Sequence, residues 1–405
     1  MMRAVLEVLR QREFRLLFLG QATSTVGDRL VFVALALYVT DIGSPTDVGI
    51  VLAAATFPLV AFVLLGGVWA DRLPRNRLMV VTDLVRGALH ALLAALIFTG
   101  TVEIWHIVVI EALFGTAEAF FRPAYSGLVP QTVEEEQIQD AKAISAAMET
   151  TAEFAGPALA TALVLGLGAG WAFAIDALTF LVSAAFLTRV RPRERGEIGV
   201  RRSLRAELRE GYAEVRSRAW IWVTVAAFGV AVLLSLGPWT TLGPTIAEDD
   251  YGSAGVFGLL SAAMGAGTVL GAVIGFRWRP EHPMRVGFFW TLPWPAVTVA
   301  FAVGAPLVLL VPLFAAAGVG LALSGIWWET ALAERIPPHT LSRVSSYDWM
   351  GSLALLPIGF LLAGPLGDAL GASLVLGVGS ALAVLVLVGA LLARENWTLR
   401  RLEPV

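Results

Sequence analysis

The sequence contains no cysteine and a single lysine, Lys142. The absence of cysteine excludes disulfides and thiol chemistry. Because Ala141 precedes the lysine, the chain has no Gly-Lys pair of a phosphate-binding P-loop. The histidines show no metal-ligand spacing; they are His90, His106, His282 and His339. We therefore expect no ATP hydrolysis, no enzyme activity, no cofactor and no metal.

Charged side chains are also scarce. They make up 15% of the residues, whereas hydrophobic residues make up 57%; soluble domains have about 25% charged residues. Apolar runs recur along the chain, and about 20 apolar residues suffice for a helix to cross the hydrocarbon core. A β-barrel would instead show short alternating strands. The composition predicts an all-α membrane protein embedded in the lipid bilayer, and a net charge of -3 gives no indication of nucleic-acid binding.

The apolar runs predict twelve transmembrane helices. Their expected positions are 14-39, 46-70, 78-100, 104-123, 140-166, 170-189, 219-245, 253-276, 285-304, 306-333, 343-366 and 369-393.

Basic residues predict the orientation of these helices. All of them except Arg29 and Arg86 lie in the two tails and in alternate loops, and the other loops have no Lys or Arg. Basic loops face the cytoplasm by the positive-inside rule. We therefore expect a protein of the inner (cytoplasmic) membrane with both termini in the cytoplasm.

The chain shows a weak internal repeat at a shift of 207 or 208 residues. "LVPQTVEEEQ" at 128-137 corresponds to "RIPPHTLSRV" at 335-344, and "FAGPALA" at 154-160 corresponds to "LAGPLGD" at 362-368. A shift of six spans preserves the direction across the membrane, as in the parallel repeats of some secondary transporters. The repeat predicts two pseudo-symmetric six-helix bundles.

These bundles set the expected domains. We predict an N-terminal bundle at 1-188, a cytoplasmic linker at 189-218 and a C-terminal bundle at 219-405. Within the linker, apolar residues recur at helical spacing, which predicts an amphipathic helix on the membrane surface; they are Leu204, Leu208, Tyr212 and Val215. A solvated linker of partial helicity is the alternative.

The loop after the second span carries a recognisable motif. In "GGVWADRLPRNR" the key positions resemble G-x-x-x-D-R-x-G-R-R, the signature loop of the major facilitator superfamily; they are Gly67, Asp71, Arg72 and Arg75. Pro74 and Asn76 depart from that pattern. The resemblance implies a gating role, in which the glycine permits close helix packing and the aspartate caps or pairs with neighbouring helices. The alternative is that the arginines only enforce topology.

Further segments resemble one branch of this superfamily. "FFRPAYSGLVP" at 120-130, "QIQDAKAISAAMETTAEFAGPALA" at 137-160 and "AFAIDALTFLVSAAFL" at 172-187 are similar to the drug and siderophore exporters, which include enterobactin exporters and macrolide efflux proteins. The resemblance implies the major facilitator fold and transport by alternating access. Lys142 and Asp176 stand where that branch usually has asparagine.

Nine charged residues lie inside the predicted spans of the first half, away from the span ends. Each costs at least about 2.5 to 3.5 kcal/mol at mid-membrane, so they must face one another or water. They are Asp28, Arg29, Asp83, Arg86, Glu111, Glu118, Glu149, Glu153 and Asp176.

The resemblance assigns roles to several of these residues. Spans 1, 4, 7 and 10 line the central cavity of the family fold, and spans 2, 5, 8 and 11 border it. We therefore expect proton-coupling carboxylates among Asp28, Glu111, Glu153 and Glu149, because desolvation raises the proton affinity of a carboxylate. A fixed Asp28–Arg86 salt bridge is the alternative for Asp28. Expected partners of the motif loop are Asp83, Glu118 and Arg122, the last two also as a local ion pair.

Two further features bear on transport. Gly156 and Pro157 resemble part of the antiporter motif G-P-x-x-G-G and predict a kink in the fifth span. In spans 7 and 10, aromatic walls and one acid could bind a bulky ligand; these candidates are Trp239, Trp327, Trp328 and Glu329. Ordinary interface anchoring is the alternative for each tryptophan.

The sequence as a whole predicts a secondary active transporter, expected to be a monomer, that exports amphipathic small molecules such as drugs or siderophores in exchange for protons. One alternative is a lipid or lysolipid flippase on the same fold. Another is a membrane receptor that transports nothing.

Overall fold

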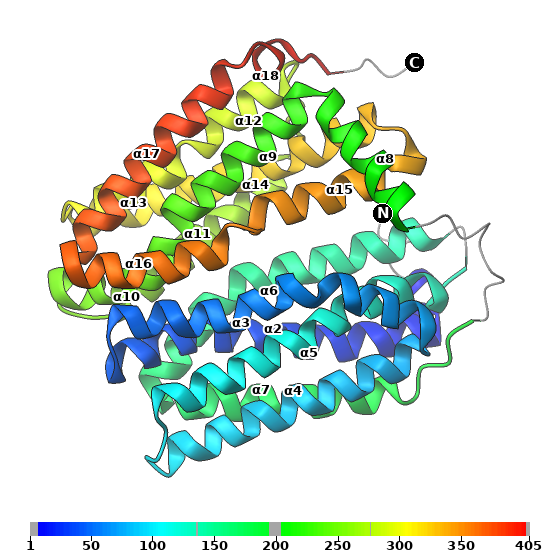
Figure 1. The fold of residues 1–405 in the computed structure, drawn as a ribbon, viewed down its shortest axis with the longest axis horizontal. Coiled ribbons are helices and arrows are strands. Elements are labelled where there is room, and N and C mark those ends of the chain that lie inside the picture. Colours follow the sequence, from blue (N-terminus) through cyan, green and yellow to red (C-terminus); the bar gives the residue numbers. More distant parts are fainter. Residues whose placement is uncertain (1–6, 135–136, 194–203, 276, 402–405) are drawn as a thin grey trace. The chain divides into compact units, whose positions relative to one another are not determined.

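The computed structural model describes residues 7–134, 137–193, 204–275 and 277–401. Some side chains within its helices also lie outside the description, and Asp71, Glu153 and Pro157 are among them. The described residues form helices and no strands (Figure 1). The chain divides into two compact units. Unit 1 comprises Met1–Gly43 and Ile50–Ile198, and unit 2 comprises Ser44–Gly49 and Gly199–Val405.

Unit 1 is built from six long helices. In chain order they are α2 (Arg12–Ile42), α3 (Pro45–Arg72), which enters unit 1 at Ile50, α4 (Arg75–Phe98), α5 (Ile104–Leu128) with the 3₁₀ turn η1 (Val129–Thr132), α6 (Ile138–Leu167) and α7 (Ala169–Leu187). Each is rich in apolar residues. In a bilayer the backbone N–H and C=O groups need partners within the protein, and a helix provides them.

Apart from Ser44–Gly49, the described helices of unit 2 run from the short linker helix α8 to the short helix α18. Its helices are α8 (Leu204–Ser217), α9 (Ala219–Ala231), the π-helical segment η3 (Val232–Leu236), α10 (Gly237–Tyr251), α11 (Gly255–Gly275), α12 (Pro283–Thr291), α13 (Pro293–Ala302), α14 (Leu307–Arg335), α15 (Pro338–Leu353), α16 (Leu356–Leu370), α17 (Ala372–Leu392) and α18 (Arg394–Thr398).

Ten helical segments in the described part of the chain are long and apolar enough to cross a membrane. The two remaining predicted spans correspond to α6, several of whose side chains lie outside the description, and to α12 and α13 together. Span 9 was expected to be one helix over 285-304. It is instead divided at Leu292 and Pro293, because proline lacks the N–H that would continue the ladder of hydrogen bonds.

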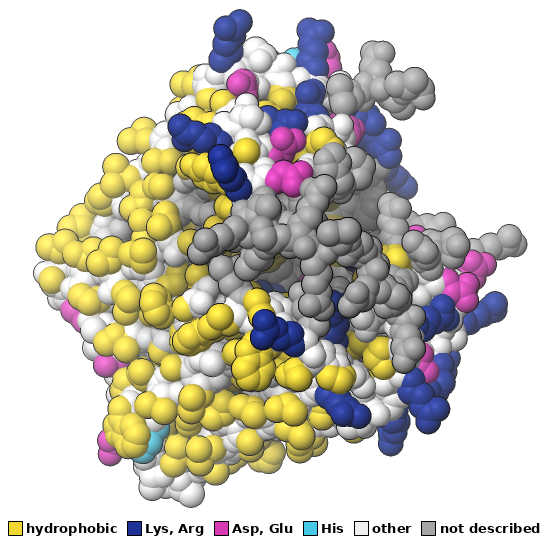
Figure 2. All heavy atoms as spheres, turned by 45° about the vertical axis from the view of Figure 1, so that its right-hand side comes forward, with side chains coloured by type: hydrophobic (Ala, Val, Ile, Leu, Met, Phe, Trp, Pro, Cys, Tyr) yellow, Lys and Arg dark blue, Asp and Glu magenta, His cyan; other side chains and the backbone are white. Residues whose placement is uncertain are grey.

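The surface agrees with a membrane environment. Large hydrophobic side chains are exposed on both units, among them Trp69 and Leu92 in unit 1 and Val308 and Leu385 in unit 2. Figure 2 shows broad areas of hydrophobic side chains on the visible face. Soluble proteins rarely expose apolar surface this extensive. The protein is therefore a multi-pass membrane protein.

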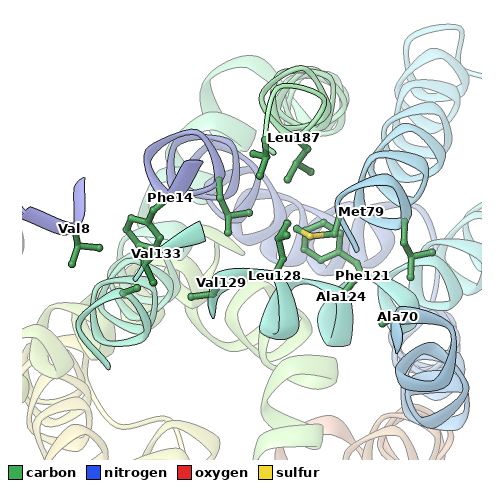
Figure 3. Close-up of a cluster of buried hydrophobic side chains, with 14 residues drawn as sticks. Val8, Phe14, Ala70, Met79, Phe121, Ala124, Leu128, Val129, Val133 and Leu187 are labelled. Atoms are coloured by element: carbon green, nitrogen blue, oxygen red, sulfur yellow. The ribbon is translucent and has the colours of Figure 1, made fainter. Parts of the chain in front are cut away.

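A buried apolar cluster holds the helix ends of unit 1 beside the motif loop. Ala70 of α3, Met79 of α4, Phe121 of α5 and Leu187 of α7 meet there (Figure 3). Fully burying a large apolar side chain contributes about 1.5 to 3 kcal/mol. The cluster gives the loop between α3 and α4 a rigid base.

Candidate functional site

Six ionisable side chains gather inside unit 1, and we call them the ion cluster. They come from four helices: Asp28 from α2, Asp83, Arg86 and His90 from α4, Glu111 from α5 and Asp176 from α7. Five of the side chains are buried, whereas 27% of the Asp28 side chain is exposed. The packing thus brings together residues up to 148 positions apart in the sequence. Among the six side chains, only that of Asp28 is partly exposed.

Arg86 is the cation at one end of the ion cluster. Its Nη2 atom lies 2.5 Å from Asp83 Oδ1, and its Nη1 atom lies 4.0 Å from Asp28 Oδ2. The guanidinium carbon also lies 4.1 Å from the ring centre of Phe121 and 4.4 Å from that of Phe180. Such cation–π contacts partly replace the hydration that a buried arginine has lost.

This pairing differs from the one expected for Asp83. The sequence predicts Asp83 as a partner of the motif loop. In the structure its side chain is fully buried and bonds to Arg86 one turn further along α4. A buried carboxylate requires a partner, and the nearest cation at helical spacing provides it. The Asp28–Arg86 salt bridge, which was the alternative for Asp28, is a long contact of 4.0 Å.

His90 lies at the other end of the ion cluster, between two carboxyl groups. Its Nδ1 atom is 2.5 Å from Asp176 Oδ2, and its Nε2 atom is 3.6 Å from Glu111 Oε1. The ring stacks on Phe114 with 4.2 Å between centres and meets Phe173 edge-on at 5.5 Å. These aromatic rings keep water from the imidazole faces.

His90 is a member of the ion cluster that the sequence pattern did not predict, because its spacing to the other histidines pointed only to the absence of a metal site. The signal that could have found it is its spacing on α4, because Asp83, Arg86 and His90 lie at i, i+3 and i+7 and therefore share one helix face. A run of ionisable groups on one face of a membrane helix points to an internal polar site.

Gly27 explains how α2 reaches the ion cluster. A Cβ atom at this position would collide with Asp176 Oδ1 and Thr179 Oγ1 of α7. Glycine therefore permits α2 and α7 to approach closely beside Asp28, as small residues do in membrane helix packing.

The charges of the ion cluster do not balance when every group is ionised. Four carboxylates, Asp28, Asp83, Glu111 and Asp176, face Arg86 and His90. Even with His90 charged, the acids exceed the bases by two. Unpaired charges in a membrane interior are costly, so the arrangement has room for added protons.

The corresponding region of unit 2 carries hydroxyl groups instead. Ser235, Thr298 and Ser380 are fully buried and bond to one another at 2.8 to 3.2 Å. Thr298 lies 208 residues after His90, the shift that relates the two halves of the sequence, and Ser380 lies 204 residues after Asp176. Ionisable groups therefore connect the spans of unit 1, and neutral hydroxyl groups connect the corresponding spans of unit 2.

The motif loop is organised around Arg75. Its Nη1 atom donates to the Gly127 carbonyl oxygen at 2.7 Å, and its Nε atom donates to the Ala70 carbonyl oxygen at 3.3 Å. Arg75 therefore binds carbonyl groups at the ends of α3 and α5 from the first turn of α4. A guanidinium at helix C-termini also favours the helix dipoles.

The glycine of the motif does not have the packing role expected of it. A Cβ atom at Gly67 would meet nothing within 4 Å, whereas one at the preceding Gly66 would collide with the Ala119 carbonyl group of α5. Gly66 is therefore the residue that permits α3 and α5 to pack closely. Arg72 is exposed, and the Asp71 side chain lies outside the described residues.

Comparison with known proteins agrees with this architecture. The model of the family "Major Facilitator Superfamily" matches residues 17–352. The chain belongs to the major facilitator superfamily. Its members are transporters, so this protein is a membrane transporter for small molecules and not an enzyme.

Curated relatives of this major facilitator protein include exporters. "Macrolide efflux protein A" of Streptococcus pyogenes is 23% identical over 89% of this chain and 90% of its own length. "Multidrug efflux pump Tap" of Mycolicibacterium fortuitum is 24% identical over 88% and 89%. "Putative bacilysin exporter BacE" of Bacillus amyloliquefaciens is 26% identical over 77% and 76%. The similarity to the drug exporter branch is confirmed.

Solved structures show the same fold. A bacterial homologue of the human lysosomal transporter Spinster, in an inward-facing conformation, matches with a TM-score of 0.74 at 16% identity and covers 98% of this chain and 99% of its own. The nucleoside transporter NupG matches with a TM-score of 0.67 at 13% identity, over 98% of this chain and 100% of its own. The prediction of a major facilitator fold is confirmed.

Other predicted positions of this major facilitator transporter lie on α5 and α6. Arg122 Nη2 and Glu118 Oε1 form an ion pair at 2.6 Å on α5. Glu149 is half-buried on α6, and the Glu153 and Pro157 side chains lie outside the described residues. A Cβ atom at Gly156 would collide with the Arg29 side chain, so Gly156 permits contact between α6 and α2.

The tryptophans expected to line a cavity have different surroundings. Trp239 is 3% exposed and packs against Phe257, Phe301 and Phe314 with ring centres 5.0 to 5.2 Å apart. It belongs to the core of unit 2, since an aromatic ring gains most by full burial.

The three candidate residues on α14 differ in their burial. Trp327 is buried and donates its indole N–H to the Trp278 carbonyl oxygen at 3.1 Å, so it also has a packing role. Trp328 is half-buried and donates to Asp348 Oδ2 at 2.7 Å, and Glu329 is exposed. Of these candidates, Trp328 and Glu329 are the ones that a ligand could reach.

Proposed function

We propose that this protein exports amphipathic small molecules in exchange for protons. The observation that carries the proposal is the ion cluster, in which buried carboxyl groups outnumber the bases and one of them, Asp28, reaches the cluster surface. A proton-coupled transporter needs acids that gain and lose protons inside the membrane. Asp28 is the group through which protons would enter and leave the cluster.

The direction and the class of cargo are supported by the relatives. Three of them are named for macrolide efflux, multidrug efflux and bacilysin export. These names differ in chemistry but agree in export. Trp328 and Glu329 would contact the cargo, because an aromatic ring and a nearby acid suit an amphipathic or cationic molecule.

Alternating access supplies the mechanism. We infer that residues 1-188 and 219-405 act as the two moving bodies, that 189-218 connects them, and that the protein works as a monomer. The loop with Asp71, Arg72 and Arg75 would act as the gate, with Glu118 and Arg122 beside it. The basic loops support an orientation with both termini in the cytoplasm and a place in the inner membrane.

Reconstitution tests the proposal directly. Purified protein in liposomes is given an imposed pH gradient, and accumulation of ethidium and of a radiolabelled macrolide is followed with and without an uncoupler. We expect gradient-driven accumulation in the wild type and its loss in Asp28→Asn. Asp249→Asn, a change of an exposed aspartate near the end of α10, is the matched control and should accumulate both compounds normally.

Two results would contradict the proposal. Accumulation that persists with the uncoupler would rule out proton coupling. Translocation of a fluorescent lysolipid without transport of either compound would favour a flippase instead.

A further inference from the structure

Two atoms of the ion cluster face each other without a hydrogen bond. His90 Nε2 and Glu111 Oε1 are both buried, lie 3.6 Å apart and have no hydrogen-bond partner among the described residues. Buried polar atoms are nearly always paired. The 3.6 Å gap is just beyond hydrogen-bond distance, so a small movement of either side chain would allow a hydrogen bond.

Asp176 determines which nitrogen of His90 carries a fixed hydrogen. Its Oδ2 atom lies 2.5 Å from Nδ1, and Thr179 Oγ1 donates to its Oδ1 atom at 3.2 Å. A carboxylate accepts hydrogen bonds, so Nδ1 is the donor to Asp176. The state of the ring then depends on Nε2, which faces Glu111.

Three proton arrangements are possible at Nε2. If His90 is neutral and Glu111 is ionised, two acceptors face each other in a dry site, which is unfavourable. If one proton is added, it resides either on Glu111 Oε1, which donates to Nε2, or on Nε2, which donates to the Glu111 carboxylate. Transfer between these two forms breaks one O–H bond and makes one N–H bond, and no other group changes.

We propose that His90 and Glu111 share one exchangeable proton, with Asp176 positioning the imidazole. The inference rests on the proposed proton-coupled function and adds a second, inner site to Asp28. When the shared proton is present the His90–Glu111 contact closes to a hydrogen bond, and when it leaves the contact opens. In this proposal the observed 3.6 Å separation corresponds to the open form.

The groups packed around His90 suit this role. Arg86 and Asp83 lie on its own helix α4, Asp28 on α2, Glu111 on α5 and Asp176 on α7. Phe114, Phe173 and Phe180 surround the ring. In this dry setting a single proton changes the electrostatic energy of the whole ion cluster.

The second half of the chain shows what packing alone requires. Thr298 and Ser380 hold the corresponding spans of unit 2 together through hydroxyl groups, which do not titrate in the physiological range. A histidine and two acids are therefore more than the helix contacts demand. The additional chemistry they provide is proton exchange.

Nitrogen-15 NMR of histidine-labelled protein in nanodiscs tests the proposal. The chain has four histidines, so His90→Gln identifies the His90 ring signals by their loss. We expect a protonated Nδ1 throughout and a pH-dependent signal from Nε2. In Glu111→Gln this pH response should shift or disappear, because the amide cannot exchange a proton.

Matched variants serve as controls. Glu103→Gln alters a glutamate that caps α5 beside His106, and it should leave the His90 signals unchanged. The wild-type spectrum alone tests the tautomer if Glu111→Gln fails to fold, and Glu111→Asp then tests the pH response. Identical His90 titration in wild type and Glu111→Gln, or an unprotonated Nδ1, would overturn the proposal.

Transport separates this inference from the proposed function. In proteoliposomes with ethidium, gradient-driven accumulation should be lost in Glu111→Gln and in His90→Asn. If the wild type is proton-driven and both variants equal it, the inner site is wrong and the function stands. If the wild type is not proton-driven although the NMR result holds, the shared proton stands and the function is wrong.

Discussion

Gly27 allows two helices to pack closely beside a charged residue, because glycine has no side chain. It has no Cβ, so α7 brings Asp176 and Thr179 against α2 one residue before Asp28. Any other residue would force the helices apart or displace the Asp176 carboxylate. The geometry of the ion cluster thus depends on a residue that carries no chemistry of its own.

We expect Gly27→Ala to lower the free energy of unfolding by about 1 to 3 kcal/mol, the usual cost of forcing extra atoms into a packed interior. Unfolding in mixed detergent micelles measures this. Gly325→Ala is the control, because a Cβ atom there meets nothing within 4 Å. Equal stability of the two variants would show that α2 and α7 are less closely packed than described.

Arg86 is the residue whose removal should cost most. We expect Arg86→Gln to lose about 3 to 5 kcal/mol of stability, because it leaves the carboxylate of Asp83 buried without its partner. Removing both charges in Arg86→Gln/Asp83→Asn should restore part of this loss. Unfolding of the four proteins in mixed micelles gives the coupling energy, and additive losses would exclude a direct pair.

At the scale of helices, two of the predicted spans are not continuous α-helices. Pro293 divides span 9 into α12 and α13, and span 7 contains the π-helical segment η3. A π segment shifts the register of the side chains that follow it. Ser235 lies in that segment and bonds to both Thr298 and Ser380.

The ends of α3 and α5 should depend on Arg75. We expect Arg75→Ala to remove charged hydrogen bonds to Gly127 and Ala70, each worth about 1.5 to 3 kcal/mol. Hydrogen–deuterium exchange should then rise in the last turn of α5. Arg77→Ala, a change of an exposed arginine in the same turn of α4, should leave this exchange as in the wild type. Equal exchange in the two variants would contradict the role of Arg75.

At the scale of the whole molecule, two similar bundles carry different chemistry. Unit 1 holds the ion cluster, whereas the corresponding contact in unit 2 is made by Ser235, Thr298 and Ser380. Ionisable groups in a membrane interior are costly and are retained for function. The bundles therefore share a fold, and the proposed coupling chemistry belongs to one of them.

This difference predicts separate effects of substitutions in the two bundles. Ser380→Ala should lower stability by about 1 kcal/mol, the net value of a hydrogen bond, and leave the pH dependence of ethidium transport unchanged. Asp176→Asn should alter that pH dependence, because it removes the carboxylate that orients His90. A changed pH profile in Ser380→Ala would place coupling chemistry in unit 2 as well.

Composition and pattern were sufficient for the fold. Apolar runs of about 20 residues predicted the spans, the repeat predicted two halves, and the loop from Gly67 to Arg77 indicated the family. The same patterns show only neighbours on one helix, as for Asp83 and Arg86. The cost of a charge in the membrane indicated that the nine charged residues of the first half must have partners. The sequence did not show which residues on other helices those partners are.

The tertiary structure alone decided those partners. His90 meets Asp176 across 86 residues and Glu111 across helices, because the packing of α2, α4, α5 and α7 brings these groups together. Trp239 and Trp327, which were predicted to line a cavity, are buried in the core of unit 2. Spacing along a chain determines which side chains share a helix face, but contact between helices depends on how their surfaces fit.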